Sequence, residues 1–61
     1  MIEFSYENFH NYHDRWFEDY RGTRFRILRY TQKVIHCDWG GERTFTWADF
    51  NKHCKLARGS E

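Results

Sequence analysis

The stretch from Phe4 to Gly22, FSYENFHNYHDRWFEDYRG, constrains the fold more than any other part of this chain. Wound as an α-helix, it gathers six aromatic rings into an arc of about 140°, at ~100° per residue, and leaves the charged and amide side chains outside that arc. The six rings belong to Tyr6, Phe9, Tyr12, Trp16, Phe17 and Tyr20. The pattern predicts an amphipathic helix against which the rest of the chain packs.

Both ends of this stretch carry the signals of a helix end. Ser5 suits the N-cap, where its hydroxyl can accept from a first-turn N–H, and Phe4 and Phe9 occupy the positions of a hydrophobic staple. Gly22 suits the left-handed conformation that ends a helix, and Arg21 suits the dipole there. We therefore expect a helix over residues 5–20.

A strand is expected next, over residues 23–31. Aromatic and β-branched residues recur there with a period of two, as they do in strands. Phe25 and Ile27 point one way, and the apolar phase changes near Ile27 and Leu28. Such a change of phase indicates a β-bulge, or a strand that is buried on both faces.

Two further strands and a second helix complete the prediction. Val34 to Trp39 forms the second strand, and Gly40-Gly41 is a strong hairpin signal that leads into a short third strand over residues 43–45. Thr46 followed by Asp49 resembles a capping box, so we expect a helix from Trp47 to about Arg58, ended by Gly59. The expected apolar residues of this helix are Trp47, Phe50, Cys54 and Ala57.

The predicted fold class is α+β, in a single domain over residues 1–61, with the order α-β-β-β-α. The apolar side of a three-stranded antiparallel meander must be covered, and two helices with one apolar stripe each can cover it. The alternative is a small SH3-like barrel built on the same three strands, with added helices. Thirteen aromatic residues offset the small core that is expected of a 61-residue domain.

Charge and composition narrow the class of protein. The net charge of +1 divides into −4 over residues 1–20 and +5 over residues 21–61, so one face could be electropositive. No apolar run approaches the ~18 residues of a membrane span, and the first residues do not have the regions of a signal peptide. Two cysteines are too few for a disulfide scaffold. We expect a cytoplasmic protein with no membrane contact, in which Cys37 and Cys54 are core thiols.

The basic first strand is the strongest candidate for a functional site. Guanidinium groups bind phosphates bidentately, aromatic rings stack on exposed bases, and a three-stranded sheet can lie in a DNA groove. An ordinary solvated sheet face would show the same arginines, which is the simpler interpretation. The candidate nucleic-acid-binding residues are Arg24, Arg26, Arg29, Tyr30, Lys33 and Arg43.

Histidine and cysteine side chains offer weaker leads, and we expect neither a metal nor a cofactor. Zinc needs four convergent ligands, whereas His36 and Cys37 point to opposite faces of a strand and His53 and Cys54 diverge by ~100° on a helix. His13 falls within the aromatic arc. A core histidine bonded to backbone, or one at the edge of the stripe, is a simpler interpretation than a catalytic base.

The sequence also indicates that the protein is not an enzyme. Ser5 is explained as a cap, and Ser60 lies close to the end of the chain. Gly40-Gly41 predicts a hairpin turn and not a phosphate-binding loop. A chain this short has little room for a walled cleft.

The run from Asp19 to Tyr30, with the hairpin and the Phe50 helix that follow, resembles short uncharacterised proteins carried by phages and prophages of enteric bacteria. Those proteins have an acidic residue before Arg-Gly, a basic and apolar strand ending in Arg-Tyr, a hairpin and an aromatic-containing helix. The resemblance implies an accessory protein that acts in host or phage DNA transactions by binding. The order of elements also resembles double-stranded-RNA-binding domains, but Trp47-Ala48-Asp49 stands where those have a lysine cluster.

Together these features predict a small non-enzymatic module of the phage accessory type, which contacts nucleic acid through a basic sheet face. The alternative is a protein–protein module that inhibits or adapts a host enzyme. It is motivated by the thirteen rings, which exceed what a small core can hide, because exposed Tyr and Trp anchor interfaces well. The same surplus would also allow a homodimer.

Overall fold

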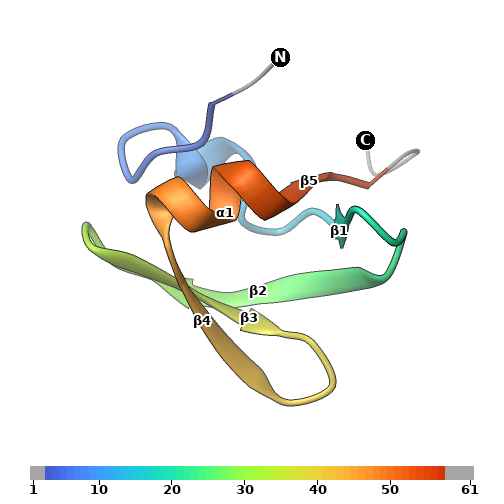
Figure 1. Ribbon diagram of the computed structural model, residues 1–61. Helices are drawn as coiled ribbons and strands as arrows, with labels where there is room; N and C mark the ends of the chain where they lie inside the picture. Colours follow the sequence, from blue (N-terminus) through green and yellow to red (C-terminus); the bar gives the residue numbers. More distant parts are fainter. Residues whose placement is uncertain (1–2, 58–61) are drawn as a thin grey trace.

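One curled antiparallel sheet organises residues 3–57, which are the residues that the computed structural model describes. Its five strands have the spatial order β4-β3-β2-β1-β5 and form a half-barrel (Figure 1). One short α-helix and one 3-10 turn accompany the sheet within these residues. The elements are η1 (Phe9–Asn11), β1 (Phe17–Asp19), β2 (Arg24–Tyr30), β3 (Val34–Asp38), β4 (Glu42–Thr46), α1 (Trp47–His53) and β5 (Cys54–Leu56).

The predicted fold, a three-stranded meander covered by two helices, is wrong. The described chain has five strands and a single α-helix, so the sheet dominates the structure. The alternative, a barrel on the same three strands with added helices, also differs from the structure. Two of the five strands, β1 and β5, lie where the sequence predicts helix.

The predicted helix over residues 5–20 is replaced by a 3-10 turn, irregular backbone and β1. Of its six rings, Phe9 and Phe17 are fully buried, whereas Tyr6, Trp16 and Tyr20 are 42%, 42% and 73% exposed. Aromatic residues, Asn, His and Asp dominate this segment, and all of them form helices poorly. Burial of two rings and the pairing of β1 with two strands therefore outweigh a regular aromatic stripe.

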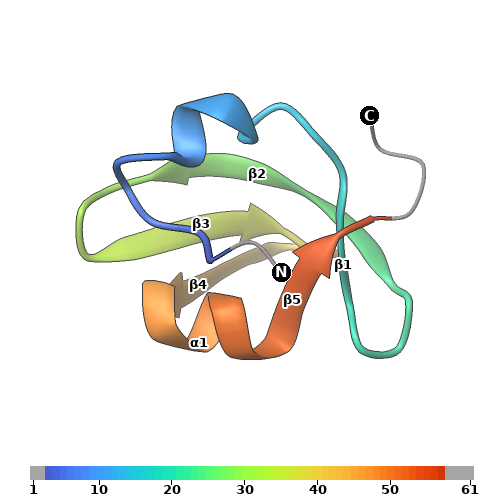
Figure 2. The same ribbon diagram turned by 90° about the horizontal axis from the view of Figure 1, so that it is seen from above.

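The N-terminal segment is fastened to α1 by an amide side chain. Asn51 Oδ1 accepts from the Phe4 backbone N–H at 2.7 Å, and Asn51 Nδ2 donates to the Phe4 carbonyl at 2.8 Å. Ser5 does not act as a helix cap; instead its backbone N–H donates to Asn8 Oδ1 at 3.0 Å. Seen from above, η1 overlies β2 and α1 lies near β4, with the N-terminal segment between η1 and α1 (Figure 2); Figure 1 shows η1 and α1 on the same side of β2, β3 and β4.

The core fills the concave side of the half-barrel. It consists of Phe4, Phe9, Phe17, Phe25, Ile35, Cys37, Phe50 and Cys54. Four of its phenylalanine rings, those of Phe9, Phe17, Phe25 and Phe50, are at most 1% exposed. Rings stacked or edge-on at 5–7 Å add to the stability that their burial provides. This cluster explains how so short a chain keeps a defined sheet.

Strands β2, β3 and β4 confirm the three predicted strands to within a residue or two. The register shifts between Ile27 and Arg29, and Leu28 is 50% exposed, so of the two predicted alternatives the structure has the bulge and not a strand buried on both faces. Gly40 and Gly41 have φ of 64° and 134°, as the hairpin signal predicts. Gly22 also has a positive φ, of 84°, but it lies in the turn between β1 and β2 and does not end a helix.

Helix α1 begins as predicted and ends early. The Asp49 N–H donates to Thr46 Oγ1 at 3.2 Å, which confirms the predicted N-cap. The helix stops at His53, and Cys54 is already extended, with φ −132° and ψ 157°. The extended backbone of Cys54–Leu56 pairs with β1, whereas a longer helix would leave that edge of β1 without these partners. The predicted helix end at Arg58 and Gly59 lies outside the described residues.

Candidate nucleic-acid interface

Three of the predicted site residues, Arg24, Arg26 and Arg29, lie on the solvent side of β2, here called the outer face. The inward residues Phe25 and Ile27 alternate with the first two of these arginines, and the bulge restores the outward direction at Arg29. All three arginines are exposed. The structure therefore brings half of the predicted set onto one face.

Each of these arginines has a carboxylate across the sheet. The register places Glu18 of β1 opposite Arg24 and Asp38 of β3 opposite Arg26. Glu18 also lies 3.7 Å from the ammonium of Lys55 in β5. Opposite charges on paired strands stabilise a sheet modestly and leave the local field close to neutral. The outer face is therefore mixed in charge.

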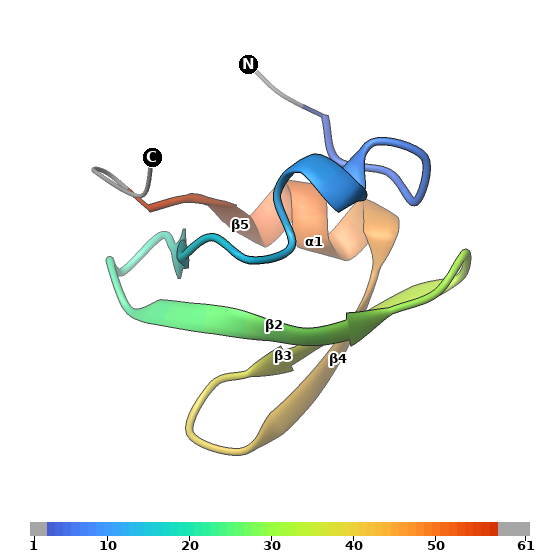
Figure 3. The same cartoon turned by 180° about the vertical axis from the view of Figure 1, so that it is seen from behind.

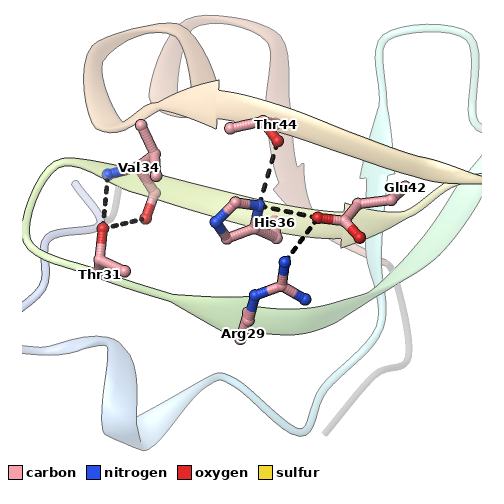
Figure 4. A network of polar contacts seen from close by, with 6 residues as sticks. All are labelled: Arg29, Thr31, Val34, His36, Glu42 and Thr44. Atoms are coloured by element: carbon pink, nitrogen blue, oxygen red, sulfur yellow. Dashed lines mark hydrogen bonds and ion pairs between the residues drawn. The ribbon is translucent and has the colours of Figure 1, made fainter.

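The third pair is part of a network across β2, β3 and β4 (Figure 4). Arg29 Nη2 lies 2.9 Å from Glu42 Oε2, and His36 Nδ1 lies 3.1 Å from the same oxygen. His36 Nδ1 is also 3.1 Å from Thr44 Oγ1. At the end of these strands, Thr31 Oγ1 accepts from the Val34 N–H and organises a turn that has no glycine. The network ties three strands together on the outer face.

Arg26 makes two further contacts. Its guanidinium lies 5.1 Å from the centroid of the Trp16 ring, and its Nη2 donates to the Asp14 carbonyl at 3.0 Å. Cation–π contacts of this kind at exposed sites are worth about 0.5–1 kcal/mol. One N–H group and the Trp16 contact of this guanidinium are thus already engaged within the protein.

The other three predicted residues lie apart from the outer face. Tyr30 points inward, where its ring packs edge-on against Phe9 and Trp47, with centroids 5.0 Å and 6.1 Å away. Lys33 lies in the turn between β2 and β3. Arg43 pairs in register with the inward residue Cys37 and therefore belongs to the concave side. The six residues do not form one surface.

Arg43 instead joins a second constellation, a groove of about 470 Å³ between the β1–β2 turn and the β3–β4 hairpin. Both connections extend toward the same end of the molecule (Figures 1 and 3). The volume falls in the range of about 300–1,000 Å³ that is typical of ligand pockets. The groove is lined by Asp19, Tyr20, Arg21, Trp39, Arg43, Phe45 and His53.

Trp39, on one wall of the groove, contacts two flat groups. The rings of Phe25 and Trp39 are stacked, with centroids 5.1 Å apart and planes inclined by 15°. The guanidinium of Arg43 lies 5.1 Å from the centroid of the Trp39 ring. Phe25 is buried in the core, whereas Arg43 is exposed. Trp39 therefore links the core to a cation that lines the groove.

The opposite wall is held by Asp19, whose side chain is buried. Its Oδ1 accepts from the backbone N–H groups of Arg21 and Thr23, at 2.8 Å and 2.9 Å. The Tyr20 hydroxyl donates to the Lys52 carbonyl, and its ring meets His53 edge-on at 6.4 Å. Tyr20 is nevertheless 73% exposed. A fixed turn therefore presents an exposed ring beside the Arg21 side chain.

The sequence signals for this groove were present, but they were assigned to other roles. The sequence pattern predicts Tyr20 and Arg21 at the end of a helix and Trp39 at the end of the second strand. The turn signature of Asp19 before Gly22, and the hairpin at Gly40-Gly41, each place an aromatic residue beside an arginine at a loop. Two loops of this kind at the same end of a sheet are the sequence signal for the groove.

The cysteines are buried thiols, and each is surrounded by core side chains. Cys37 and Cys54 are free and are 0% and 6% exposed. Burial, and next the proximity of Cys54, raises the pKa of Cys37 to about 12. Burial, and next the Asp19 carboxylate, raises the pKa of Cys54 to about 12. No group of three His, Cys, Asp or Glu side chains within residues 3–57 is arranged to hold a metal ion.

The remaining histidines do not form a site with these cysteines. His13 is exposed and lies 6.1 Å from the Tyr30 ring, so the expectation of a core histidine is wrong. His36 belongs to the outer-face network and His53 to the groove. In the part of the chain that the structure describes, no helix is long and apolar enough to span a bilayer.

Comparisons with known proteins do not assign this chain to a family. No protein-family model matches the chain, and neither the curated proteins nor the solved structures contain a match to it. The resemblance to phage and prophage proteins stays a hypothesis. The function must therefore be inferred from the groove and the outer face themselves.

Proposed function

We propose that this protein is a non-enzymatic module that binds nucleic acid, and that the groove between the β1–β2 turn and the β3–β4 hairpin is its contact surface. The observation that supports it is the lining of this groove, in which two arginines and three aromatic rings stand beside one carboxylate. Guanidinium groups bind phosphate oxygens bidentately, and aromatic rings stack on bases. The Asp19 Oδ1 atom is already engaged by two backbone N–H groups.

The outer face supports nucleic-acid binding less well. A carboxylate lies across the sheet from Arg24, Arg26 and Arg29 alike. Phosphate groups approaching that face would meet those carboxylates and would have to compete with existing contacts. Arg43 is the one member of the predicted set that lines the groove.

The setting that we propose is the cytoplasm of a bacterial host, where the module would serve phage or prophage DNA transactions. Two free, buried cysteines support a reducing compartment. The phage resemblance of the segment from Asp19 to Tyr30 supports the accessory role. The proposal assigns no catalytic residue.

Matched double substitutions test which surface binds. Arg21→Gln with Arg43→Gln removes two charges from the groove, and Arg24→Gln with Arg26→Gln removes two charges from the outer face. Binding of a labelled oligonucleotide is followed by fluorescence anisotropy over a range of salt concentrations. The double substitution in the groove should weaken binding. It should also reduce the slope of log affinity against log salt concentration by about 1.4, because each phosphate contact of a single strand contributes ~0.7. Equal losses in both pairs, or a loss in the outer-face pair alone, would contradict the assignment.

A second candidate function is protein binding through the outer face, and the exposure of two apolar side chains there favours it. Trp16 is 42% exposed and Leu28 is 50% exposed, and the guanidinium of Arg26, on β2 with Leu28, lies over the Trp16 ring. Exposed Trp and Arg are common interface anchors. A pull-down from bacterial lysate, treated or untreated with nuclease, separates the two functions. A partner that survives nuclease and is lost in Leu28→Ser would favour this candidate.

A further inference from the structure

We infer that the groove receives an unpaired nucleobase, so that the module prefers single-stranded nucleic acid to duplex. This inference rests on the proposed function and specifies its ligand. It is drawn from the flat groups that the groove presents, which are Tyr20 on one wall and Trp39 with the Arg43 guanidinium on the other.

Trp39 carries a flat cation on which another flat group can stack. The Phe25 ring is stacked on Trp39, and the Arg43 guanidinium lies over the Trp39 ring. Arg43 is itself exposed. Guanidinium planes stack on splayed bases much as aromatic side chains do. A base seated on Arg43 would extend the stack and bring its phosphate close to the same positive charge.

Tyr20 provides a second flat surface that is already in position. Its ring is 73% exposed, although its hydroxyl donates to the Lys52 carbonyl and its backbone lies in the turn held by Asp19. A side chain that is fixed before binding loses little entropy when a ligand stacks on it. The exposed ring therefore has the properties of a preorganised stacking platform.

A duplex does not fit this arrangement. In a double helix both faces of each base are covered by neighbouring bases, so neither Tyr20 nor Arg43 could stack on one without opening the helix. A duplex would depend on phosphate contacts alone, and the broad outer face offers arginines that already face carboxylates. The groove thus favours a strand whose bases are free.

Three fluorescein-labelled probes test the inference on the full 61-residue chain. They are a single strand of about 12 thymidines, an abasic strand of equal length and a duplex of equal length. This length falls within the site sizes of small domains that bind single strands. We expect the abasic strand and the duplex to bind roughly 5- to 100-fold more weakly than the thymidine strand. Equal affinities for all three probes would overturn the inference and leave the proposed function standing. If no probe binds at low salt, the proposed function is wrong.

Substitutions at Tyr20 separate stacking from charge. Tyr20→Leu should weaken binding of the thymidine strand and leave binding of the abasic strand unchanged, whereas Tyr20→Phe, which keeps the ring, should retain most of the preference. An equal loss for both strands in Tyr20→Leu would overturn the inference. Because this side chain is mostly exposed, both variants should fold, and circular dichroism checks that they do.

Discussion

At the scale of single residues, the buried phenylalanine rings make the main contacts of the core. Phe9 and Phe17 are both fully buried and stack with their centroids 5.5 Å apart. Phe17 also contacts Phe4, Phe25 and Phe50. By contrast, Trp16 and Tyr20, which an amphipathic helix would bury beside them, are 42% and 73% exposed.

Phe17→Ala should lower the free energy of unfolding by about 3–5 kcal/mol, because it leaves a cavity in a close-packed core. Tyr20→Ala should lower it by less than about 1 kcal/mol, since that ring is mostly exposed. Urea denaturation followed by circular dichroism gives both values, and Phe17→Leu provides a milder variant if Phe17→Ala does not fold. Similar costs at the two positions would support the helical stripe and contradict the half-barrel.

The two thiols make stability depend on pH in the alkaline range. Both have a pKa raised from 9.0 to about 12 in the folded protein, chiefly by burial. The folded state therefore favours the neutral thiol, so this contribution is complete below about pH 9 and is lost progressively between pH 9 and about pH 12. At about pH 10.5 each thiol should cost roughly 2 kcal/mol of stability relative to neutral pH.

The double variant Cys37→Ala with Cys54→Ala checks this effect. Its free energy of unfolding should fall less steeply between about pH 8 and about pH 10.5 than that of the unaltered protein, because other titrating groups are common to both. Reagents that require a thiolate should also react slowly with the folded protein. Parallel pH profiles, or fast labelling of the folded protein at pH 8, would contradict the buried placement of the thiols.

At the scale of elements, the sequence predicts the central strands well and the two ends poorly. The bulge near Ile27, the Gly40-Gly41 hairpin and the Thr46 cap are local features whose causes lie within a few neighbouring residues, so they could be predicted. β1 and β5 depend on each other across more than thirty residues, since Phe17 pairs with Leu56. Within the described residues β5 pairs with β1 alone, and β1 takes one of its two partners from that distant strand, so both have little local signal.

The polar attachment of the N-terminal segment to α1 is made by Asn51, beside the contacts of the Phe4 and Phe9 rings with Phe50. Asn51 exchanges two hydrogen bonds with the backbone of Phe4 and donates a third to the Trp47 carbonyl, at 2.9 Å. Asn51→Ala should lower the free energy of unfolding by about 1–3 kcal/mol, because it leaves partly buried backbone groups without partners. Hydrogen exchange at the Phe4 amide should accelerate more than at amides of β3.

Asn8→Ala is the matched control for this element. Asn8 also bonds two backbone groups, the Ser5 N–H and the Glu3 carbonyl, but its bonds stay within the N-terminal segment. Its replacement should cost less stability than Asn51→Ala and should leave the Phe4 amide protected. A larger effect at Asn8 would show that the segment is held by its own turns and not by α1.

At the scale of the whole molecule, curling of the sheet decides what each charged residue can reach. Along the sequence, the acidic first third and the basic remainder look like separate regions, which is why a basic sheet face was expected. Once β1 lies beside β2, Glu18 of the acidic region comes opposite Arg24 of the basic one. The groove arises in the same way, from loops that are about twenty residues apart in sequence. Neither effect can be derived from charge counts along the chain.

The central claim is that the groove, and not the outer face, contacts nucleic acid. The most direct test is a ¹H–¹⁵N titration of the protein with a thymidine strand, read at two indole N–H signals. Trp39 lines the groove, and Trp16 lies under Arg26 at the outer face. The account predicts that the Trp39 signal and the amides of residues 19–21 and 43 shift while the Trp16 signal stays in place. Shifts at Trp16, Arg26 and Arg29 with an unchanged Trp39 signal would contradict it.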